Sequence, residues 1–356
     1  MSRSPEAVGT FFYARHCNHS ETGCSRGPFL DQPGNKKGVS PMAMEDRAGR
    51  RFREHRNLLV VLGPTASGKT GLAVCLARRI GGEILSADSR QVYRGMDLGT
   101  GKDLTEYGCG GEVIPFHLID ICDPDEEFSV FAFQELFYPC FREILRRGRI
   151  PVLAGGTGLY LDAVLRGYRM VAVPENPKLR ERLAGEQMES LRRRFLSLFP
   201  DAHNTTDLLE PKRLIRAIEI AEFSQAHPRD PETPIAVSPL VIGIRCERND
   251  LRRKITLRLQ VRLEAGMIDE VRRLHDRGIA WKRLESFGLE YRYISLYLQQ
   301  KITREEMFQT LNTRIHQLAK RQETWFRRME RNGVRIHWIE GADEEAALGL
   351  IAGLTE

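Results

Sequence analysis

Short aliphatic runs alternate with longer stretches of helical character along most of this chain. A short apolar run bounded by glycine or proline is typical of a buried strand, and amphipathic stretches between such runs are typical of helices that cover a sheet. The alternation therefore predicts an α/β fold built on one parallel sheet. We expect its strands at residues 58–62, 83–87, 117–120, 150–154, 240–245 and 334–339.

The strand pattern stops between about residues 166 and 235, where charged sequence of helical character takes over. Prolines stand at both borders and favour helix ends and stiff connections there. We interpret this stretch as an inserted helical domain. The predicted division is a core in two parts, 57–165 and 236–345, an insert, 166–235, and a C-terminal tail, 346–356.

Residues 1–56 differ from the rest, because they contain few aliphatic residues and no sustained hydrophobic period. Such a composition predicts a disordered extension. Two other interpretations stay open. The arginines of this segment are typical of a transit peptide, although its acidic residues argue against one, and a start codon assigned too early would place the true start at Met42 or Met44.

Two long amphipathic helices are expected after the insert. In the first, aliphatic residues recur every four positions from Leu251 to Leu263 and form a core-facing stripe. Arg258 and Arg262 fall on a different stripe of that helix. The second, at about residues 304–331, has apolar residues at near-heptad spacing on one face. These are Met307, Leu311, Ile315, Leu318, Trp325 and Met329.

The bulk composition narrows the class of protein. The seven cysteines are scattered without a Cys-x-x-Cys pair, which favours free thiols in a reducing compartment over a disulfide framework. No apolar run reaches the ~20 residues of a membrane span, so we expect no membrane association. A formal charge of +6, with basic residues gathered at 178–216, 245–262 and 314–331, permits a nucleic-acid partner. Solvated helix faces explain such clusters equally well.

The strongest chemical motif follows the first expected strand. There the chain reads Gly63-Pro64-Thr65-Ala66-Ser67-Gly68-Lys69-Thr70, the complete spacing of a P-loop. The glycines let backbone N–H groups turn inward as an anion nest, and the next helix adds the partial positive charge of its N-terminus. Lys69 supplies a point charge and Thr70 a hydroxyl for Mg²⁺. We expect this loop to bind a polyphosphate.

Asp88 lies just after the second expected strand, in the stretch Ser86-Ala87-Asp88-Ser89-Arg90-Gln91-Val92-Tyr93. Ligands of open α/β sheets lie beyond the carboxyl ends of the strands, so Asp88 should face the same crevice as the P-loop. A carboxylate there can accept a proton or hold Mg²⁺ through water. The alternative is that Asp88 caps the turn that follows it.

Three further stretches are less specific. The turn Gly155-Gly156-Thr157-Gly158 follows a strand but lacks the spacing of a dinucleotide fingerprint. The aromatic run at 128–133 could line an apolar pocket, although core packing is favoured. Residues 319–327 combine cations, an amide and aromatics, which suits either a packed helix with a basic exterior or a surface that binds phosphates and an unpaired RNA base.

Taken in order, these stretches resemble the tRNA dimethylallyltransferases, the isopentenyl transferases that modify the adenosine next to the anticodon. The resemblance covers about residues 57–339 and rests on motifs in a fixed order. They are G-P-T-A-S-G-K-T, S-A-D-S-R-Q-V-Y-R-G-M-D-L-G-T, D-I-C-D-P, A-G-G-T-G-L-Y and A-K-R-Q-E-T-W-F-R. The resemblance implies a sheet like that of the P-loop nucleoside triphosphate hydrolases, with the helical insert binding tRNA.

The resemblance also implies an activity. The dimethylallyl group would pass from dimethylallyl diphosphate to N6 of adenosine 37, in tRNAs that read codons beginning with U, giving N6-isopentenyladenosine and diphosphate. The P-loop would hold the diphosphate, with Thr70 near Mg²⁺, the implied cofactor. Arg258 resembles the arginine that reaches the leaving group, and Asp88 matches the general base. The implied partners are dimethylallyl diphosphate and a tRNA anticodon stem-loop, and the implied state is a cytoplasmic monomer.

The binding positions are carried over residue by residue from the matching motifs. The diphosphate-binding positions are Gly63, Pro64, Thr65, Ala66, Ser67, Gly68, Lys69 and Thr70. The tRNA-binding positions are Asp88, Ser89, Arg90, Gln91, Thr157, Arg180, Lys212, Arg213, Arg216, Lys320, Arg321, Gln322, Thr324, Trp325 and Arg327. Core packing is the alternative for Trp325, and a solvated polar face is the alternative for Gln322.

Some positions depart from the family pattern. Glu290, in Gly288-Leu289-Glu290, stands where a basic residue after Gly-Tyr is usual, His316 stands where an arginine is usual, and Glu210 replaces a common aspartate. These departures affect expected tRNA contacts and leave the P-loop and Asp88 intact. The sequence also lacks the C-terminal zinc finger of many eukaryotic members, so a bacterial-type enzyme is expected.

Two other functions fit the motifs taken singly. A P-loop kinase that acts on a small nucleotide or metabolite would need a nucleoside triphosphate. An RNA-binding protein with a relic P-loop would need no catalytic groups, and the intact Lys69, Thr70 and Asp88 argue against it.

Overall fold

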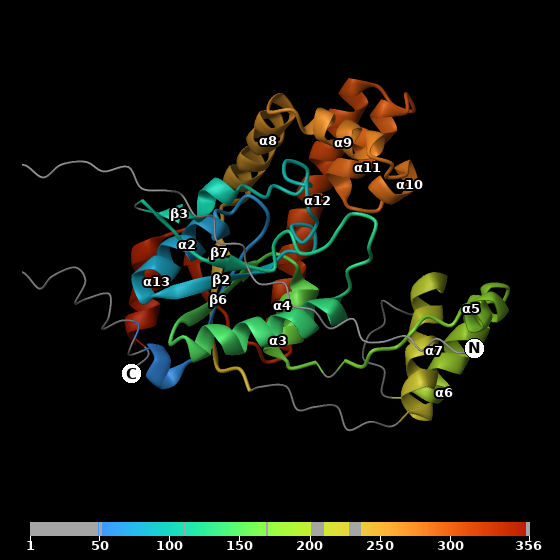
Figure 1. The fold of residues 1–356 in the computed structure, drawn as a ribbon, viewed down its shortest axis with the longest axis horizontal. Helices are drawn as coiled ribbons and strands as arrows, with labels where there is room; N and C mark the ends of the chain where they lie inside the picture. Colours follow the sequence, from blue (N-terminus) through green and yellow to red (C-terminus); the bar gives the residue numbers. More distant parts are fainter. Residues whose placement is uncertain are drawn as a thin grey trace, which may run out of the picture. The chain divides into compact units, whose positions relative to one another are not determined.

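The computed structural model describes residues 49, 52–109, 111–168, 170–200, 210–227 and 236–353. Among the described residues its main sheet has six strands, all paired in parallel, in the order β5-β2-β6-β1-β7-β8. Figure 1 labels β2, β6 and β7 of this sheet. They are β1 (Leu58–Leu62), β2 (Gly82–Ala87), β5 (Phe116–His117), β6 (Ile150–Gly155), β7 (Pro239–Arg245) and β8 (His337–Glu340). The predicted α/β class is confirmed, although β5 and β8 are shorter than expected.

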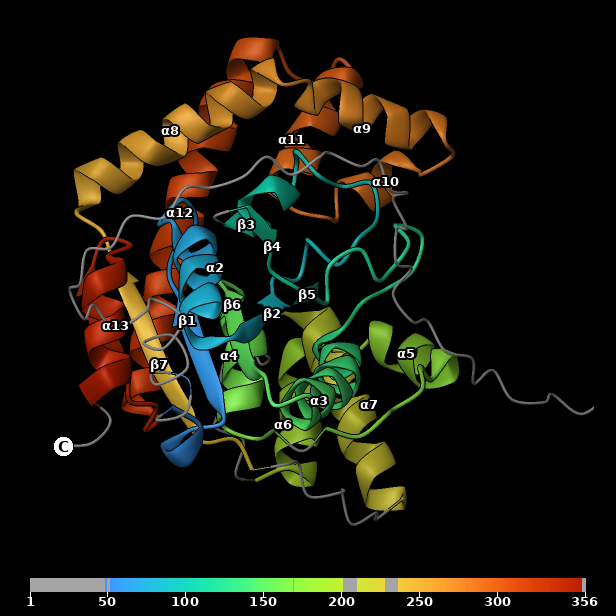
Figure 2. The same cartoon turned by 60° about the vertical axis from the view of Figure 1, so that its left-hand side comes forward.

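The sheet is buried on both faces. Successive side chains of a strand point to opposite sides, so each strand contributes to two cores. Leu59 and Val61 enter one apolar core, which includes α2 and α13, while Val60 and Leu62 enter another, which includes α3 and α4. Figure 2 shows α2 and α13 side by side near β1 and β7. These helices are α2 (Lys69–Ile80), α3 (Val130–Arg146), α4 (Gly158–Leu165) and α13 (Glu344–Ala352).

The ends of the core differ from the predicted division of the chain. Residues 52–55 are helical, and Phe52 is fully buried in the core. The expectation of disorder up to residue 56 is therefore wrong for residues 52–56, and the other interpretations of the extension concern residues outside the described ones. The predicted tail at 346–356 also needs correction, because Ala347 and Ile351 of α13 pack into the core.

The described part of the insert contains three helices, α5 (Pro177–Ala184), α6 (Met188–Leu198) and α7 (Pro211–Ala226). Proline opens α5 and α7 at the first helical position, where its missing N–H costs no hydrogen bond. The three helices share their own apolar cluster, made of Leu179, Leu183, Leu191, Phe195, Leu214, Ile215 and Ile218. The helical character is as expected, and the assignment as a separate domain stays a prediction.

A further helical group follows β7, and α12 links it to the sheet. Met307 and Leu311, near the start of α12, pack with α8, α9 and α11. Phe326 and Met329, near its end, pack in the core that the sheet shares with α3 and α4. A capping box at Thr303 fixes where α12 begins. The group comprises α8 (Arg248–Glu264), α9 (Met267–Asp276), α10 (Trp281–Leu284), α11 (Leu289–Leu298) and α12 (Arg304–Arg331).

Some smaller features of the core are as expected and one is not. The core stripe of α8 is confirmed, because Leu251, Ile255 and Leu259 are buried. Core packing is also confirmed for Phe133 in the aromatic run. The chain adds a short hairpin that the sequence did not predict, in which β3 (Gly108–Cys109) pairs with β4 (Glu112–Val113) after the 3-10 helix η1 (Leu104–Tyr107). Within the described ranges, every helix is too short or too polar to span a bilayer.

Candidate active site

The P-loop connects β1 to α2 and has the backbone geometry of an anion-binding loop. Ala66 has φ 62° and Gly68, the N-cap of α2, has φ 85°, both in the left-handed region. Gly68 adopts this conformation without strain because it has no Cβ. The first turn of α2 contains no acidic residue, so the partial positive charge of its N-terminus is free to attract an anion.

Lys69, the first residue of α2, brings a cation to this loop. Its Nζ donates a hydrogen bond to the carbonyl oxygen of Pro64 at 3.3 Å. Burial, together with the nearby charge of Arg258, lowers the pKa of Lys69 to about 8, while Asp88 acts in the opposite direction. Burial acts this way because desolvation disfavours the charged form. A bound anion would favour the ammonium form again, so the site is electrostatically suited to a phosphate.

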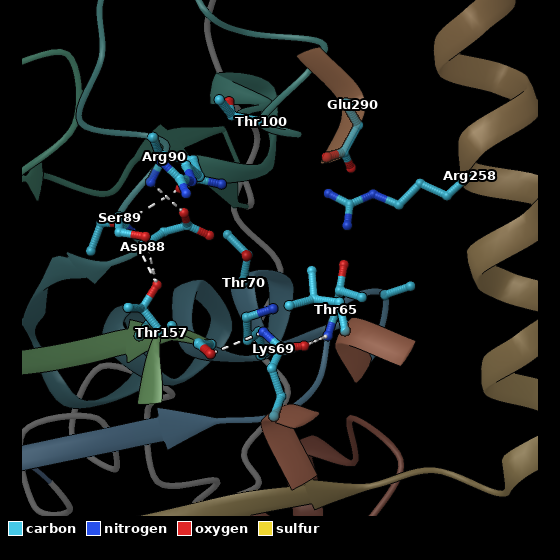
Figure 3. A pocket seen from close by; sticks show the side chains of 18 of the residues that line it. Thr65, Lys69, Thr70, Asp88, Ser89, Arg90, Thr100, Thr157, Arg258 and Glu290 are labelled. Carbon is cyan, nitrogen blue, oxygen red and sulfur yellow. Dashed lines mark hydrogen bonds between the residues drawn. The ribbon is translucent and has the colours of Figure 1, made fainter. Parts of the chain in front are cut away.

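A cavity of about 790 Å³ lies at the carboxyl ends of β2 and β6, next to the P-loop. Figure 3 shows Lys69, Asp88 and Arg258 pointing toward this space from different elements. The fold thus joins parts of the chain that are far apart in sequence. The predicted site residues that line the cavity are Thr65, Ala66, Gly68, Lys69, Thr70, Asp88, Ser89, Arg90, Gln91, Thr157, Arg258, Arg321, Gln322 and Trp325.

The other predicted site residues lie outside the cavity lining. Some belong to the P-loop, some occupy the exposed face of α12, and some belong to the insert. Their proposed contacts with RNA or diphosphate stay predictions. They are Gly63, Pro64, Ser67, Arg180, Lys212, Arg213, Arg216, Lys320, Thr324 and Arg327.

Three arginines of the insert that were predicted to bind RNA, Arg180, Arg213 and Arg216, are already paired with acids. Glu219, whose side chain is only 2% exposed, forms ion pairs with Arg180 at 3.0 Å and with Arg216. Burial alone would raise the pKa of Glu219, but hydrogen bonds from these arginines lower it below its usual range. Arg213 pairs with the exposed Glu210 at 3.1 Å. Glu219 escaped the sequence prediction. Its spacing of three residues from Arg216 was a visible signal for one ion pair, whereas its partner Arg180 lies on another helix.

Asp88 follows β2 directly, and its side chain reaches the cavity (Figure 3). Its Oδ1 accepts a hydrogen bond from the N–H of Arg90 at 2.9 Å, so it also closes the turn. Oγ1 of Thr157 accepts a hydrogen bond from the N–H of Ser89 at 3.0 Å and ties this turn to the glycine-rich turn after β6. The turn-capping alternative is therefore compatible with a carboxylate that faces the cavity.

Gln322 of α12 connects two glycine-rich turns of the site. Its Oε1 accepts a hydrogen bond from the N–H of Thr65 at 2.8 Å, and its Nε2 donates one to the carbonyl oxygen of Gly156 at 2.9 Å. A Cβ at Gly156 would lie 2.5 Å from that Nε2, so glycine is needed for this approach. The solvated alternative is wrong for Gln322, and its amide positions the P-loop relative to the turn after β6.

Trp325 lies one helical turn from Gln322 and forms part of the cavity wall. Its indole covers Gly158, where an added Cβ would come within 2.4 Å of the ring. Its Nε1 is buried and has no hydrogen-bond partner among the described residues. Trp325 therefore packs against the core, as one alternative predicted, and also forms part of the cavity wall.

A loop after β2 closes another side of the cavity, and Glu270 of α9 holds it. The buried carboxylate accepts hydrogen bonds from the N–H groups of Asp97, Leu98 and Gly99 at 3.0, 2.7 and 2.9 Å. The hydroxyl of Tyr291 donates a further bond to it at 2.6 Å. These bonds fix the loop against α9 and α11.

Sequence reasoning missed Glu270 and Tyr291, and it placed Arg262 on the same helix face as Arg258 without assigning it to the site. For Glu270 the available signal was an acidic residue on the apolar face of α9, between Met267 and Val271. For Arg262 the signal was its spacing of four residues from Arg258, which predicts a shared helix face. The structure confirms that shared face, because both arginines line the cavity.

Two protein-family models match this chain. The family described as IPP transferase matches residues 91–329, and the one described as isopentenyl transferase matches residues 56–107. This chain belongs to the IPP transferase family. It is 59% identical over 291 residues to tRNA dimethylallyltransferase 2 of Trichlorobacter lovleyi, covering 82% of this chain and 94% of that protein. It is 61% identical over 293 residues to tRNA dimethylallyltransferase 1 of Syntrophus aciditrophicus, covering 82% and 96%.

Solved structures agree with membership of the IPP transferase family. The tRNA isopentenylpyrophosphate transferase of Bacillus halodurans has a TM-score of 0.60 and 34% identity to this chain, covering 84% of it and 98% of that protein. A eukaryotic dimethylallyltransferase, solved while acting on tRNA, has a TM-score of 0.66 at 22% identity, covering 82% of this chain and 75% of that one. The second likeness concerns the fold alone.

Proposed function

We propose that this chain transfers the dimethylallyl group from dimethylallyl diphosphate to N6 of adenosine 37 in tRNA. The observation that carries the proposal is the arrangement of charge in one cavity. Lys69 and Arg258 reach it from the P-loop side and from α8, and the carboxylate of Asp88 reaches it from the end of β2 (Figure 3). A prenyl transfer needs cations for the leaving group and a base for the nucleophile.

The leaving group explains the cations. Cleavage of the carbon–oxygen bond places negative charge on the diphosphate and positive charge on the allylic carbon. Preorganised donors at the diphosphate stabilise this charge separation, and a single such donor is typically worth ~3 kcal/mol of transition-state energy. In the proposal the loop from Gly63 to Thr70 binds the diphosphate, and Lys69 and Arg258 stabilise the charge as it develops.

The nucleophile explains Asp88. The adenine N6 forms a bond to C1 of the prenyl group, diphosphate departs, and the proton from N6 passes to a base. Asp88 is assigned this role because its carboxylate lies across the cavity from the cations. The adenine must leave the base stack to reach such a site, which suits recognition of an unpaired loop.

The donor set at the P-loop also fits Mg²⁺. The described residues contain no cluster of three acidic, histidine or cysteine side chains able to hold a metal. Mg²⁺ commonly binds through one or two protein oxygens together with substrate phosphates and water, and the Thr70 hydroxyl is such an oxygen. When bound, the ion would neutralise charge on the diphosphate. Binding of the tRNA anticodon stem-loop, a monomeric state and a cytoplasmic location complete the proposal.

The proposal is tested by supplying labelled dimethylallyl diphosphate and an anticodon stem-loop with adenosine 37, with hydrolysis of ATP measured in parallel. We expect transfer of the label to RNA and release of diphosphate. A matched stem-loop with another base at position 37 is the control. ATP-dependent phosphorylation of a small nucleotide, without label transfer, would instead favour the kinase alternative.

A further inference from the structure

Two arginines of α8 lie side by side at the cavity, although the proposed function uses only one of them. Arg258 and Arg262 are one helical turn apart, and both line the cavity. A Cβ at Gly101 would lie 2.6 Å from Nη2 of Arg258 and 2.8 Å from Nη2 of Arg262. The two guanidinium groups therefore converge on Gly101, next to Thr100 of the cavity wall.

Arg262 forms a hydrogen bond through its Nε, but one of its terminal nitrogens has no hydrogen-bond partner among the described residues. Its Nε donates a hydrogen bond to the carbonyl oxygen of Leu98 at 2.5 Å, and its side chain is 13% exposed. Its Nη2 is buried and has no hydrogen-bond partner among the described residues. A buried guanidinium donor without a partner is unfavourable, so an oxygen acceptor that reached the Arg262 guanidinium from the cavity it lines would be stabilised there.

Glu290 of α11 is far from these arginines in the sequence but forms an ion pair with Arg262 in the structure. Its Oε1 lies 3.8 Å from Nη1 of Arg262, and Figure 3 shows its carboxylate pointing toward Arg258. Burial raises the pKa of Glu290, while Arg262 and Arg258 act in the opposite direction. Together the two arginines and one glutamate keep an excess of positive charge at the cavity.

We propose that Arg262 is a second phosphate-binding arginine of this cavity and that Glu290 is the positioning residue that keeps its guanidinium there. The proposal rests on the proposed function, because the phosphate is either that of the prenyl donor or that of the RNA backbone beside the target base. A guanidinium offers paired N–H groups that match phosphate oxygens, which an unpaired Nη2 beside Arg258 can provide.

Titration calorimetry with inorganic pyrophosphate and with an anticodon stem-loop distinguishes the two sources. Arg262→Met keeps much of the side-chain volume and removes the donors, so we expect the affinity for one of the two ligands to fall about tenfold or more. A lower affinity for pyrophosphate would show that Arg262 binds the diphosphate of the prenyl donor. A lower affinity for the stem-loop would show that it binds a phosphate of the RNA backbone. Arg272→Met on the exposed face of α9 is the matched control, since Arg272 pairs with Asp269 outside the cavity.

Unchanged affinity of Arg262→Met for both ligands, with an unchanged melting temperature, would overturn the proposal. Lys69→Ala separates this failure from that of the proposed function. If Lys69→Ala loses pyrophosphate while Arg262→Met binds both ligands normally, only the role of Arg262 is wrong. If the wild-type protein binds neither ligand, both proposals are wrong.

Charge exchange tests the positioning role of Glu290. Arg262→Glu places two carboxylates side by side, and the double variant Arg262→Glu with Glu290→Arg restores an opposite pair with the cation on α11. We expect the double variant to bind the assigned ligand several-fold more tightly than Arg262→Glu alone. Equal weakness of the two variants at equal melting temperature would show that Glu290 does not act through Arg262.

Discussion

The cavity and the insert both contain clustered cations but pair them differently. In the cavity, Lys69 and Arg258 donate to the neutral carbonyl groups of Pro64 and Gly101, which leave their charges uncompensated by a hydrogen-bonded acid. In the insert, the buried Glu219 forms ion pairs with two arginines. Basic clusters that look alike in sequence thus have different capacities for an anion. Lys69 and Arg258 can therefore bind an anion without first breaking an ion pair, whereas Arg180 and Arg216 stabilise the buried Glu219 of the insert. Arg262 is intermediate, because it lines the cavity and also pairs with Glu290.

The largest expected effect concerns the acidic side of the cavity. Asp88→Asn keeps the shape of the side chain and its Oδ1 contact with Arg90 but removes the base. We expect single-turnover prenyl transfer to fall by ~10²-fold or more, the usual scale for general-base loss. Affinity for the stem-loop should stay within a few-fold of wild type. Quench-flow transfer and an RNA titration on the same preparation check this, and a parallel loss of both quantities would make Asp88 a binding residue.

The charge of Lys69 gives a pH-dependent test of the cavity. Its pKa is lowered to about 8, chiefly by burial, so the ammonium form is populated below this pH and lost above it. A bound diphosphate raises that pKa, so binding above pH 8 takes up a proton and becomes weaker as pH rises. We expect the pyrophosphate affinity to fall by up to about tenfold per pH unit above this point.

Titration calorimetry between pH 7 and 9.5 measures this pH dependence. Lys69→Met is the matched control, because pyrophosphate's own ionisation affects both proteins and cancels in the comparison. An identical pH profile for the two proteins would contradict the role of Lys69. Persistence of the difference in Arg262→Met would show that the two cations act separately.

Gln322 should have an intermediate effect. Gln322→Ala removes both bonds that join the P-loop to the turn after β6, so the diphosphate site and Asp88's turn are no longer held in register. We expect transfer to fall ~10-fold or more, because catalytic geometry is sensitive to small displacements. Gln322→Glu is the informative second variant, since it keeps the acceptor for Thr65 but replaces the donor to Gly156. Stem-loop discrimination that changes while pyrophosphate affinity does not would return Gln322 to the predicted role in RNA recognition.

The sequence predicted what local patterns determine. The strand at Leu58–Leu62 and the glycines after it specify the P-loop, and the position of Asp88 after the next strand brings it to the same end of a parallel sheet. The inward stripe of α8 follows from spacing alone. In α12 the stripe is only partly as predicted, because Ala319 and Phe326 are buried, whereas the predicted Leu318 and Trp325 are half-buried and line the cavity. The family resemblance added the activity, and the comparisons confirm membership of that family.

The sequence could not predict contacts between distant elements. The bond from Thr65 to Gln322 joins residues 257 positions apart, and no periodicity indicates that an amide on α12 faces a backbone N–H group. Glu290 stood out only as a departure from the family pattern until the structure placed Arg262 opposite it. The core role of α13 was likewise hidden, since a short apolar stretch near the end of a chain has no partner visible in sequence.

The smallest expected effect separates an exposed arginine of the insert from a buried pair. Arg213 has a side chain 58% exposed and an exposed partner in Glu210, so RNA phosphate can replace that partner at little cost. If it contacts phosphate, Arg213→Ala should reduce the slope of log K against log salt concentration by about 0.7 to 0.9. Arg193→Ala on α6, an exposed residue outside the predicted contacts, should leave the slope unchanged.

Arg216 completes this comparison, because its removal leaves the buried Glu219 with fewer partners. Arg216→Ala should therefore lower the melting temperature of the protein, which Arg213→Ala should not do. Stem-loop titrations at several salt concentrations, with melting curves for each variant, distinguish the two effects. If Arg213→Ala keeps the wild-type slope, its phosphate contact is wrong. If Arg216→Ala lowers the slope without a loss of stability, this arginine binds RNA directly. The cations of the insert would then bind an anion as those of the cavity do, despite the ion pair between Arg216 and Glu219.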